Sequence, residues 1–364
     1  MIKRITSKTL FTNIRQLIQK SKEELHTAIN HALTLTYFHV GRLIVEYEQG
    51  GASKAAYASK TLTGLSKKLN REFGRGFSVD NLENMRAFYL TYKQAYEVYA
   101  KKRKSETLSR KLVSSVKAGS QKSETLSRKS FFLLSWSHYM ILLKIENRDE
   151  RKFYEIEAIN EQWSIRELKR QYDSALYERL VLSRNKKKVR ELSKKGHVIS
   201  TPSDAIKDPY ILEFLNLSEK DVYTENDFEC AIIDQLENFL KELGKGFLFV
   251  DRQKRIRMDG EDYFIDLVFY HRILRCFVLI DLKIGTLKHQ DLGQLQMYVN
   301  YYDEQVKAEE ENKTIGIILC KSKKENIIRY TLGSGNRQIF ASKYKMFFPE
   351  KQVLKLLQAQ HTSN

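Results

Sequence analysis

The sequence predicts an α-helical N-terminal domain over residues 1–200, followed by an α/β domain over residues 201–364 that is built on a mixed central sheet. In the first part, apolar residues recur at spacings of three and four, and no proline occurs before Pro202. In the second part, short apolar runs rich in β-branched and aromatic residues alternate with helical patterns. A basic run is followed by glycine and proline between residues 196 and 210, and we expect the domain boundary there.

The composition indicates an anionic partner. The chain has 364 residues, enough for two or three domains, and a formal net charge of +18 at pH 7. This excess favours a nucleic-acid partner over a merely solvated basic surface. No stretch reaches the ~18 apolar residues of a membrane span, the start lacks a signal-peptide core, and the three cysteines are scattered. We therefore expect a cytoplasmic protein without a membrane partner.

The N-terminal region contains a pattern similar to a helix-turn-helix. A helix that includes Leu33–Tyr47 should end at Gly50-Gly51, and a second should begin near Tyr57. Gly74 and Gly76 then break the chain, and Ser78 is a candidate N-cap for a third helix. That third helix could lie in a DNA groove, or it could be part of an ordinary helical bundle. The polar residues that would read the groove are Asn81, Asn84 and Arg86.

Two basic runs occur in this region, one near its middle and one near its C-terminal end. Residues 101–130 contain the sequence KSETLSRK twice, and we interpret this segment as a flexible basic loop. Residues 184–195 form the second run. We expect these runs to contact nucleic-acid phosphates, although the helical domain could instead mediate homo-oligomerisation. The residues proposed for phosphate contact are Lys101, Lys102, Arg103, Lys104, Lys186, Lys187 and Lys188.

Further helices are expected between and after these runs. Helical patterning returns over residues 131–143, where His138 beside Trp136 and Tyr139 is interpreted as a packed core group rather than a base. Another helix should start near Ser164, with Glu167 completing a capping box.

The second domain should contain helices and strands in the order typical of a layered α/β fold. Asp259-Gly260 predicts a hairpin turn. The predicted helices are 227–243, 290–302 and 350–357, and the predicted strands are 247–258, 263–270, 275–282, 314–320, 327–332 and 338–342.

Two carboxylates lie inside apolar strands of this domain. Asp266 and Asp281 each occupy such a strand, and a buried carboxylate is costly unless it is paired or bound to a cation. Lys283 follows Asp281 by two residues, so both side chains point to the same face. The backbone carbonyl of Leu282 is a further candidate ligand. This layout is typical of a site that binds a hard divalent metal and hydrolyses phosphodiesters.

Three further residues are candidates for the same site. Glu229 lies in the first turn of the helix before the strands, where it could act as a ligand or serve the helix dipole alone. Gln294 and Tyr298 are four residues apart, hence on one helix face, and could orient substrate or water. Ordinary helix packing would explain that spacing equally well.

The motifs resemble a known nuclease group. Glu229, Asp266, the D-L-K triplet at Asp281–Lys283 and the Q-x-x-x-Y pair resemble the PD-(D/E)xK superfamily. Longer phrases resemble its YhcG-like branch, which joins a helical N-terminal domain to this nuclease; they include GFSVDNLENMRAFY, FYEIEAINEQWSIRELKRQ, LYERLVLSRNK, ELGKGFLFVDRQKRI and DLVFYHRILRCFVLIDLKIG. Ile265 stands where the superfamily motif has proline, and Asp281 stands where many relatives have glutamate.

The resemblance implies a restriction-endonuclease-like fold, a Mg²⁺ cofactor with Mn²⁺ as an alternative, and nuclease chemistry. The leading hypothesis is a metal-dependent DNA nuclease acting in repair, recombination or defence against foreign DNA. An RNA nuclease, and a non-catalytic binding or assembly protein that keeps the fold, are the alternatives.

Overall fold

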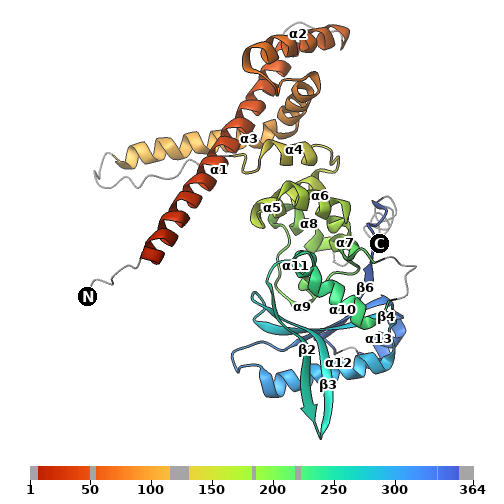
Figure 1. The fold of residues 1–364 in the computed structure, drawn as a ribbon. Coiled ribbons are helices and arrows are strands. Elements are labelled where there is room, and N and C mark those ends of the chain that lie inside the picture. The colour runs from red at the N-terminus through yellow and green to blue at the C-terminus, as the bar shows by residue number, and fades with distance from the viewer. Residues whose placement is uncertain are drawn as a thin grey trace. The chain divides into compact units, whose positions relative to one another are not determined.

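The computed structural model describes residues 7–49, 55–114, 131–182, 186–217, 223–333 and 335–351 (Figure 1). The chain divides into two compact units. The first comprises residues 1–151 and 158–165, and the second comprises residues 152–157 and 166–364. No helix in the described part of the chain is both long enough and apolar enough to cross a membrane.

The first unit is helical and packs around the crossing of two long helices. Gly41 lies at this crossing, where a Cβ atom would come within 2.0 Å of the carbonyl oxygen of Met85. Only a residue without a side chain permits so close a backbone approach. Aromatic rings including Phe38, Phe88 and Phe132 pack beside the crossing. The helices are α1 (Ser7–Gln49), α2 (Ala55–Phe73), α3 (Val79–Ser114) and α4 (Trp136–Leu142).

Several predicted boundaries of the first unit are confirmed. α2 ends before Gly74 and Gly76, which have φ angles of 82° and 129°. The hydroxyl of Ser78 accepts a hydrogen bond from the amide of Asn81 at 3.2 Å and so caps α3. α1 ends at Gln49, and the predicted stop at Gly50-Gly51 lies outside the described residues.

Two predictions for this unit are wrong. Residues 101–114 do not form a loop, because α3 continues through the first KSETLSRK copy to Ser114. Lysine, arginine, glutamate and leucine have high helix propensity, and a basic run can extend a helix as readily as interrupt it. The second copy lies outside the described residues. The helix expected from residue 131 begins only at Trp136. Phe131 and Phe132 lie before the helix and pack against Tyr96.

The second unit contains further helices before and between its strands. α6 begins at Ile165, directly after the predicted start at Ser164. α5 (Arg148–Asn160) contributes residues to both units. The remaining helices are α6 (Ile165–Asp173), α7 (Leu176–Leu182), α8 (Lys186–Lys195), α9 (Pro202–Ala205), α10 (Glu225–Asp234), α11 (Leu236–Leu243), α12 (His289–Tyr301) and α13 (Glu325–Leu332).

A six-stranded mixed sheet forms the centre of this unit, in the order β1-β6-β5-β4-β3-β2. β2 to β4 pair antiparallel, whereas β4, β5, β6 and β1 pair parallel. The hairpin between β2 and β3 turns at Asp259 and Gly260, as predicted, with φ angles of 50° and 88°. The strands are β1 (Tyr210–Ile211), β2 (Phe247–Met258), β3 (Glu261–His271), β4 (Cys276–Thr286), β5 (Ile315–Ser322) and β6 (Ile339–Lys345).

Helices cover both faces of the sheet. Phe228 of α10 and Phe239 of α11 share one core with Phe269 and Ile280 of the sheet. On the other face, Leu295 and Tyr298 of α12 pack with strand residues that include Leu279. The mixed α/β prediction is therefore confirmed.

Two element predictions in this unit are wrong. The helix predicted over 227–243 is two helices, α10 and α11, separated at Gln235, whose φ and ψ of −112° and 29° are not helical. The segment 327–332, predicted as a strand, is part of α13. Short apolar runs do not distinguish strand from helix. The predicted helix 350–357 lies outside the described residues beyond Lys351.

Candidate active site

The candidate site forms where β3 and β4 cease to pair. Their ladder runs from His271 opposite Cys276 to Leu267 opposite Ile280. One residue further along β3, the carboxylate of Asp266 accepts a hydrogen bond from the backbone amide of Leu282 at 2.8 Å. A side chain thus takes the place of the next ladder bond, and it brings Asp266 to the strand segment that carries Asp281.

Asp281 and Lys283 form an ion pair at this position. Nζ of Lys283 lies 3.0 Å from Oδ2 of Asp281, 3.3 Å from the carbonyl oxygen of Leu282 and 3.5 Å from Oε2 of Glu225. Asp281 is 3% exposed, whereas Lys283 is partly open to solvent. Lys283 is therefore held by the buried Asp281 and the exposed Glu225, and it can still reach a ligand from the solvent side.

The electrostatics of the site disfavour a state in which Asp281, Asp266 and Glu229 are all ionised without a bound cation. Burial raises the pKa of Asp281 to about 7; Lys283 opposes this rise, and Asp266 adds to it. Burial also raises the pKa of Asp266, against the opposing hydrogen bond from Leu282. The pKa of Glu229 is raised by burial as well, with a contribution from Asp266. A cation among these groups would relieve both desolvation and mutual repulsion.

Gln253 links Glu229 to Asp266. Its side-chain amide donates to Oε2 of Glu229 and, at 3.1 Å, to Oδ1 of Asp266. Gln253 has a φ of 43°, and it falls between the ladder pairs formed by Arg252 and Lys254 of β2. A left-handed non-glycine residue on a strand is uncommon and marks local strain, which is frequent at functional sites. Sequence reasoning missed Gln253, because a glutamine in a polar strand carries no distinguishing pattern.

Gln294 and Tyr298 lie together on α12, Tyr298 on the face that packs on the sheet and Gln294 exposed beside it. The amide of Gln294 donates to the hydroxyl of Tyr298. Tyr298 is buried, which raises its pKa, and its charge environment includes Asp281, Asp266 and Lys283. The two residues are thus oriented by each other, and Tyr298 lies within electrostatic range of Asp281 and Asp266.

The donor set suits a metal that takes few protein ligands. Among the described residues, no group of three or more His, Cys, Asp or Glu side chains is arranged to hold a metal ion. Mg²⁺ is commonly held by one or two carboxylates together with waters and substrate phosphates. Asp266, Asp281 and the carbonyl of Leu282 meet that requirement. Glu229 approaches Asp266 through the amide of Gln253.

The polar residues proposed to read DNA have contacts within the first unit. Asn81 donates to the carbonyl of Gly76 and accepts a hydrogen bond from the indole of Trp136, at 2.5 Å and 3.0 Å. Arg86 pairs with Glu48 at 2.7 Å, and Asn84 is half-buried. Base reading by Asn81 or Arg86 would therefore compete with contacts that hold the helices together.

The basic residues differ in how far the structure describes them. Lys101, Lys102 and Arg103 lie exposed on α3. Lys104 follows on α3, and Lys186, Lys187 and Lys188 begin α8, but their side chains lie outside the described part of the structure. His138 contacts Ser135 and the carbonyl of Trp163, and burial lowers its pKa, as fits the packed role predicted for it.

Comparison with known proteins agrees with this architecture. Residues 203–360 match the family described as the YhcG PDDEXK nuclease domain, and residues 13–179 match the DUF1016 N-terminal domain. Fold and site thus define a PDDEXK nuclease joined to a helical N-terminal domain. The chain is 40% identical over 348 residues to "Putative nuclease YhcG" of Escherichia coli (strain K12), covering 94% of this chain and 90% of that protein. The chain belongs to the YhcG nuclease family.

Solved structures give more distant matches. One is the crystal structure of a repair endonuclease from Pyrococcus abyssi, with a TM-score of 0.24 and 18% identity over 36% of this chain. Another is an EndoMS–dsDNA2 complex, also with a TM-score of 0.24 and 18% identity, over 37% of this chain. The match spans about half the length of each solved chain, 50% in both cases.

Proposed function

We propose that this protein is a metal-dependent deoxyribonuclease whose active site is formed by Asp266, Asp281 and Lys283, with Glu229, Gln294 and Tyr298 around them. The observation that carries the proposal is the meeting of Asp266 and the Asp281–Lys283 ion pair where β3 and β4 cease to pair. The family supports nuclease chemistry; the metal and the DNA substrate are our inference from charge and donor chemistry.

The carboxylates would hold a divalent cation, which would polarise the scissile phosphate and lower the pKa of an attacking water. Mg²⁺ fits an oxygen-only donor set, and Mn²⁺ is the alternative. The chain's own residues supply orientation. Gln253 and the amide of Leu282 fix both oxygens of Asp266, and Asp281 holds Lys283.

Lys283 is placed to neutralise charge on the substrate. Its ammonium lies beside Asp281 and is partly exposed, so a phosphate oxygen could approach it from solvent. Stabilising charge that develops on a phosphate is a large part of phosphodiester hydrolysis. Gln294 and Tyr298, on the covering helix, could position a water or substrate group nearby.

A direct assay tests this proposal. The purified full-length chain is incubated with linear, circular, branched and single-stranded DNA, and with RNA, in Mg²⁺, Mn²⁺ or EDTA. Cleavage of DNA that needs the metal and is lost in EDTA is expected. Cleavage of RNA alone would change the substrate class, and binding without cleavage of any substrate would favour a non-catalytic role.

A further inference from the structure

We propose that α1 mediates antiparallel homodimerisation, in which the exposed apolar face of its N-terminal half docks into the groove between α1 and α2 of a second copy. This inference concerns assembly and does not depend on the nuclease chemistry. It rests on three features of the first unit: an uncovered apolar stripe on α1, an apolar groove between α1 and α2, and the symmetric spacing of the stripe residues on either side of Ile29.

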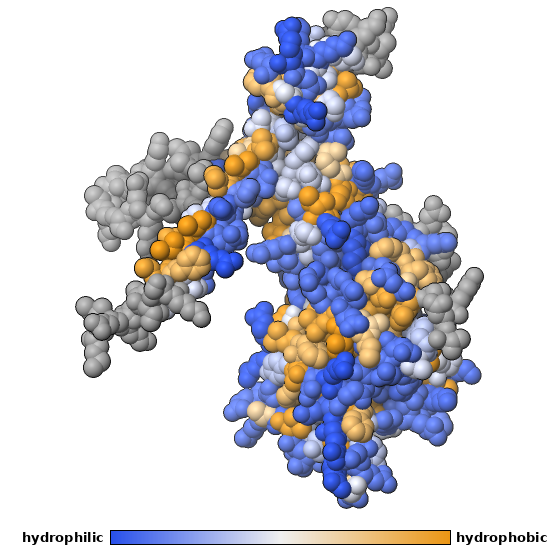
Figure 2. All heavy atoms as spheres, viewed as in Figure 1, coloured by the Kyte–Doolittle hydropathy of each residue, from blue (hydrophilic) through white to orange (hydrophobic). Residues whose placement is uncertain are grey.

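The N-terminal half of α1 is uncovered within the described part of the chain. Every residue from Thr9 to Thr27 is exposed. Seven large apolar residues of this half of α1 are between 47% and 67% exposed, and Figure 2 shows hydrophobic side chains gathered along this part of α1: Leu10, Phe11, Ile14, Leu17, Ile18, Leu25 and Ile29. All of these except Leu10 and Leu17 share one helix face and form the stripe. An isolated helix is marginally stable in water and usually depends on burial of its apolar face. Such a stripe is therefore typical of a protein interface.

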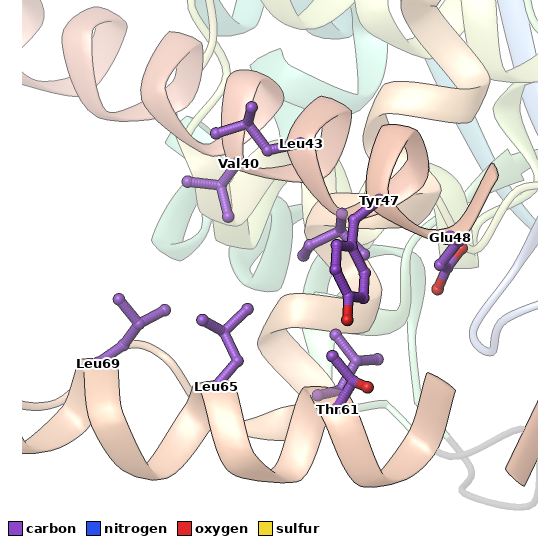
Figure 3. Close-up of a pocket in the computed structure, with 9 residues that line it drawn as sticks. Val40, Leu43, Tyr47, Glu48, Thr61, Leu65 and Leu69 are labelled. Atoms are coloured by element: carbon purple, nitrogen blue, oxygen red, sulfur yellow. The ribbon is translucent and has the colours of Figure 1, made fainter. Parts of the chain in front are cut away.

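The stripe continues along the same helix into a groove. Leu33, Val40, Leu43 and Tyr47 follow Ile29 at spacings of four, seven, three and four residues, which keeps them on the face of Phe11 and Ile14. The last three line a pocket of about 360 Å³ with residues of α2 that include Leu65 and Leu69. Figure 3 shows the side chains from the two helices pointing toward each other across this pocket.

The face that packs on α3 is a different one. Gly41 contacts α3 at the crossing, and Phe38 and Val45 are buried. The N-terminal part of the stripe therefore lies outside the core that the described residues form, and it is available to a partner, whereas Val40 packs beside that core.

The stripe is symmetric about Ile29. Counting outward from Ile29, Leu25 matches Leu33, Ile18 matches Val40 and Phe11 matches Tyr47 at equal separations, while Ile14 matches Leu43 to within one residue. An antiparallel pair of α1 helices with its two-fold axis at Ile29 would therefore place apolar side chains opposite each other along the whole length. Both copies would then use the same surface, which gives a closed dimer.

Charge and area support the same arrangement. The N-terminal half of α1 carries Lys8, Arg15, Lys20 and Lys22 against Glu23 and Glu24, whereas its C-terminal half carries Glu46 and Glu48 against Arg42. This distribution favours antiparallel over parallel pairing. The eight half-exposed stripe residues would each lose on the order of 80 Å², or roughly 640 Å² from α1 alone, which approaches the ~800 Å² per partner of a standard interface.

The oligomeric state of the full-length protein tests the proposal. Light scattering coupled to size exclusion should give twice the 42.8 kDa chain mass at tens of micromolar. The double variant Ile14→Glu/Ile18→Glu should weaken dimerisation at least tenfold while its circular dichroism spectrum stays unchanged. Gln16→Glu, which adds negative charge to the opposite face of α1, should remain dimeric. A monomeric wild type, or equal weakening by Gln16→Glu, would overturn the proposal.

Cysteine cross-linking tests the orientation, in a Cys230→Ser background that removes the one free thiol that is only half-buried. Ile29→Cys lies at the proposed axis and should form a disulfide dimer alone. Ile14→Cys should do so only when mixed with Leu43→Cys. Efficient self-cross-linking of Ile14→Cys would indicate parallel pairing and reject this arrangement.

Discussion

Nη1 of Arg179 lies 2.8 Å from Oε1 of Glu242, and both side chains are almost fully buried. Arg179 belongs to α7, at the last residue of the match to the DUF1016 N-terminal domain, and Glu242 belongs to α11, within the match to the nuclease domain. Arg170 also contacts Glu242, at 3.2 Å, and Nζ of Lys207 donates to its carbonyl. These contacts join helices of the N-terminal family segment to the sheet-bearing unit.

The first prediction concerns this buried pair. Glu242→Gln should lower the free energy of unfolding by about 3–5 kcal/mol, because removing one partner leaves Arg179 charged and uncompensated. Denaturant unfolding of the full chain measures the change. Glu237→Gln is the control, because Glu237 forms an exposed pair with Lys241 on the same helix and should matter little. Equal effects of both substitutions would contradict the structural role of the buried pair.

The same carboxylate predicts a pH dependence. Burial alone would raise the pKa of Glu242, but Arg179, Lys207 and Arg170 lower it to about 2, from an ordinary value of 4.5. Its stabilisation should therefore be complete above pH 4.5 and disappear as the pH falls from 4.5 toward 2. Stability measured over this range should decline more steeply for the wild type than for Glu242→Gln; parallel curves would show that another group dominates.

Fragments should show which helices the nuclease domain needs. A fragment that starts at Ser164 keeps Arg170 and Arg179, whereas one that starts at Pro202 loses both and leaves Glu242 buried without them. We expect the longer fragment to unfold cooperatively and the shorter one to be markedly less stable. Thermal unfolding of the two compares them directly, and equal melting temperatures would place the boundary at Pro202.

Substitutions in the proposed active site should separate catalysis from binding. Asp266→Ala and Lys283→Ala should each reduce cleavage by roughly two orders of magnitude or more, with folding and DNA affinity nearly unchanged. Asp259→Asn, in the turn of the same hairpin, is the matched control and should cleave normally. Parallel loss of binding and cleavage would instead indicate a structural role.

Substitution of Gln253 tests whether this residue positions Asp266, without adding strain to the backbone. Gln253→Gly removes the amide that joins Glu229 to Asp266, while glycine accepts the positive φ without strain. Cleavage should fall by about 10–100-fold, with the melting temperature unchanged or raised. Unchanged cleavage would show that Leu282 alone orients Asp266.

Salt dependence tests whether the basic residues proposed to bind DNA contact its phosphates. Lys101, Lys102 and Arg103 are exposed on α3, and each phosphate that a substitution leaves without its basic partner should reduce the slope of log affinity against log salt by roughly 0.9. The triple substitution to serine should therefore flatten the slope by up to about 2.7. An unchanged slope would remove this segment from the DNA interface.

The sequence predicted the strands around the site well because their composition is distinctive. β2 to β4 combine apolar, β-branched and aromatic runs with an Asp-Gly turn, and the carboxylates of Asp266 and Asp281 stand out against that background. The break at Gln235 left no such sign, because the spacing of Phe228, Ile232, Phe239 and Leu243 suits one helix as well as two. The bridge through Gln253 depends on a backbone conformation and on an interaction between distant strands and helices, neither of which is visible in local patterning.

A small rotation of α1 at the Gly41 crossing would displace the distant N-terminal end of the helix. From that point the helix extends toward Ser7 for some thirty-four residues, or about 50 Å. A methyl group at position 41 would push against the Met85 carbonyl and tilt the helix. A tilt of about 5° would move its far end by roughly 4 Å. A change of one small side chain near the middle of the helix would thus misalign a surface several turns away, without touching that surface.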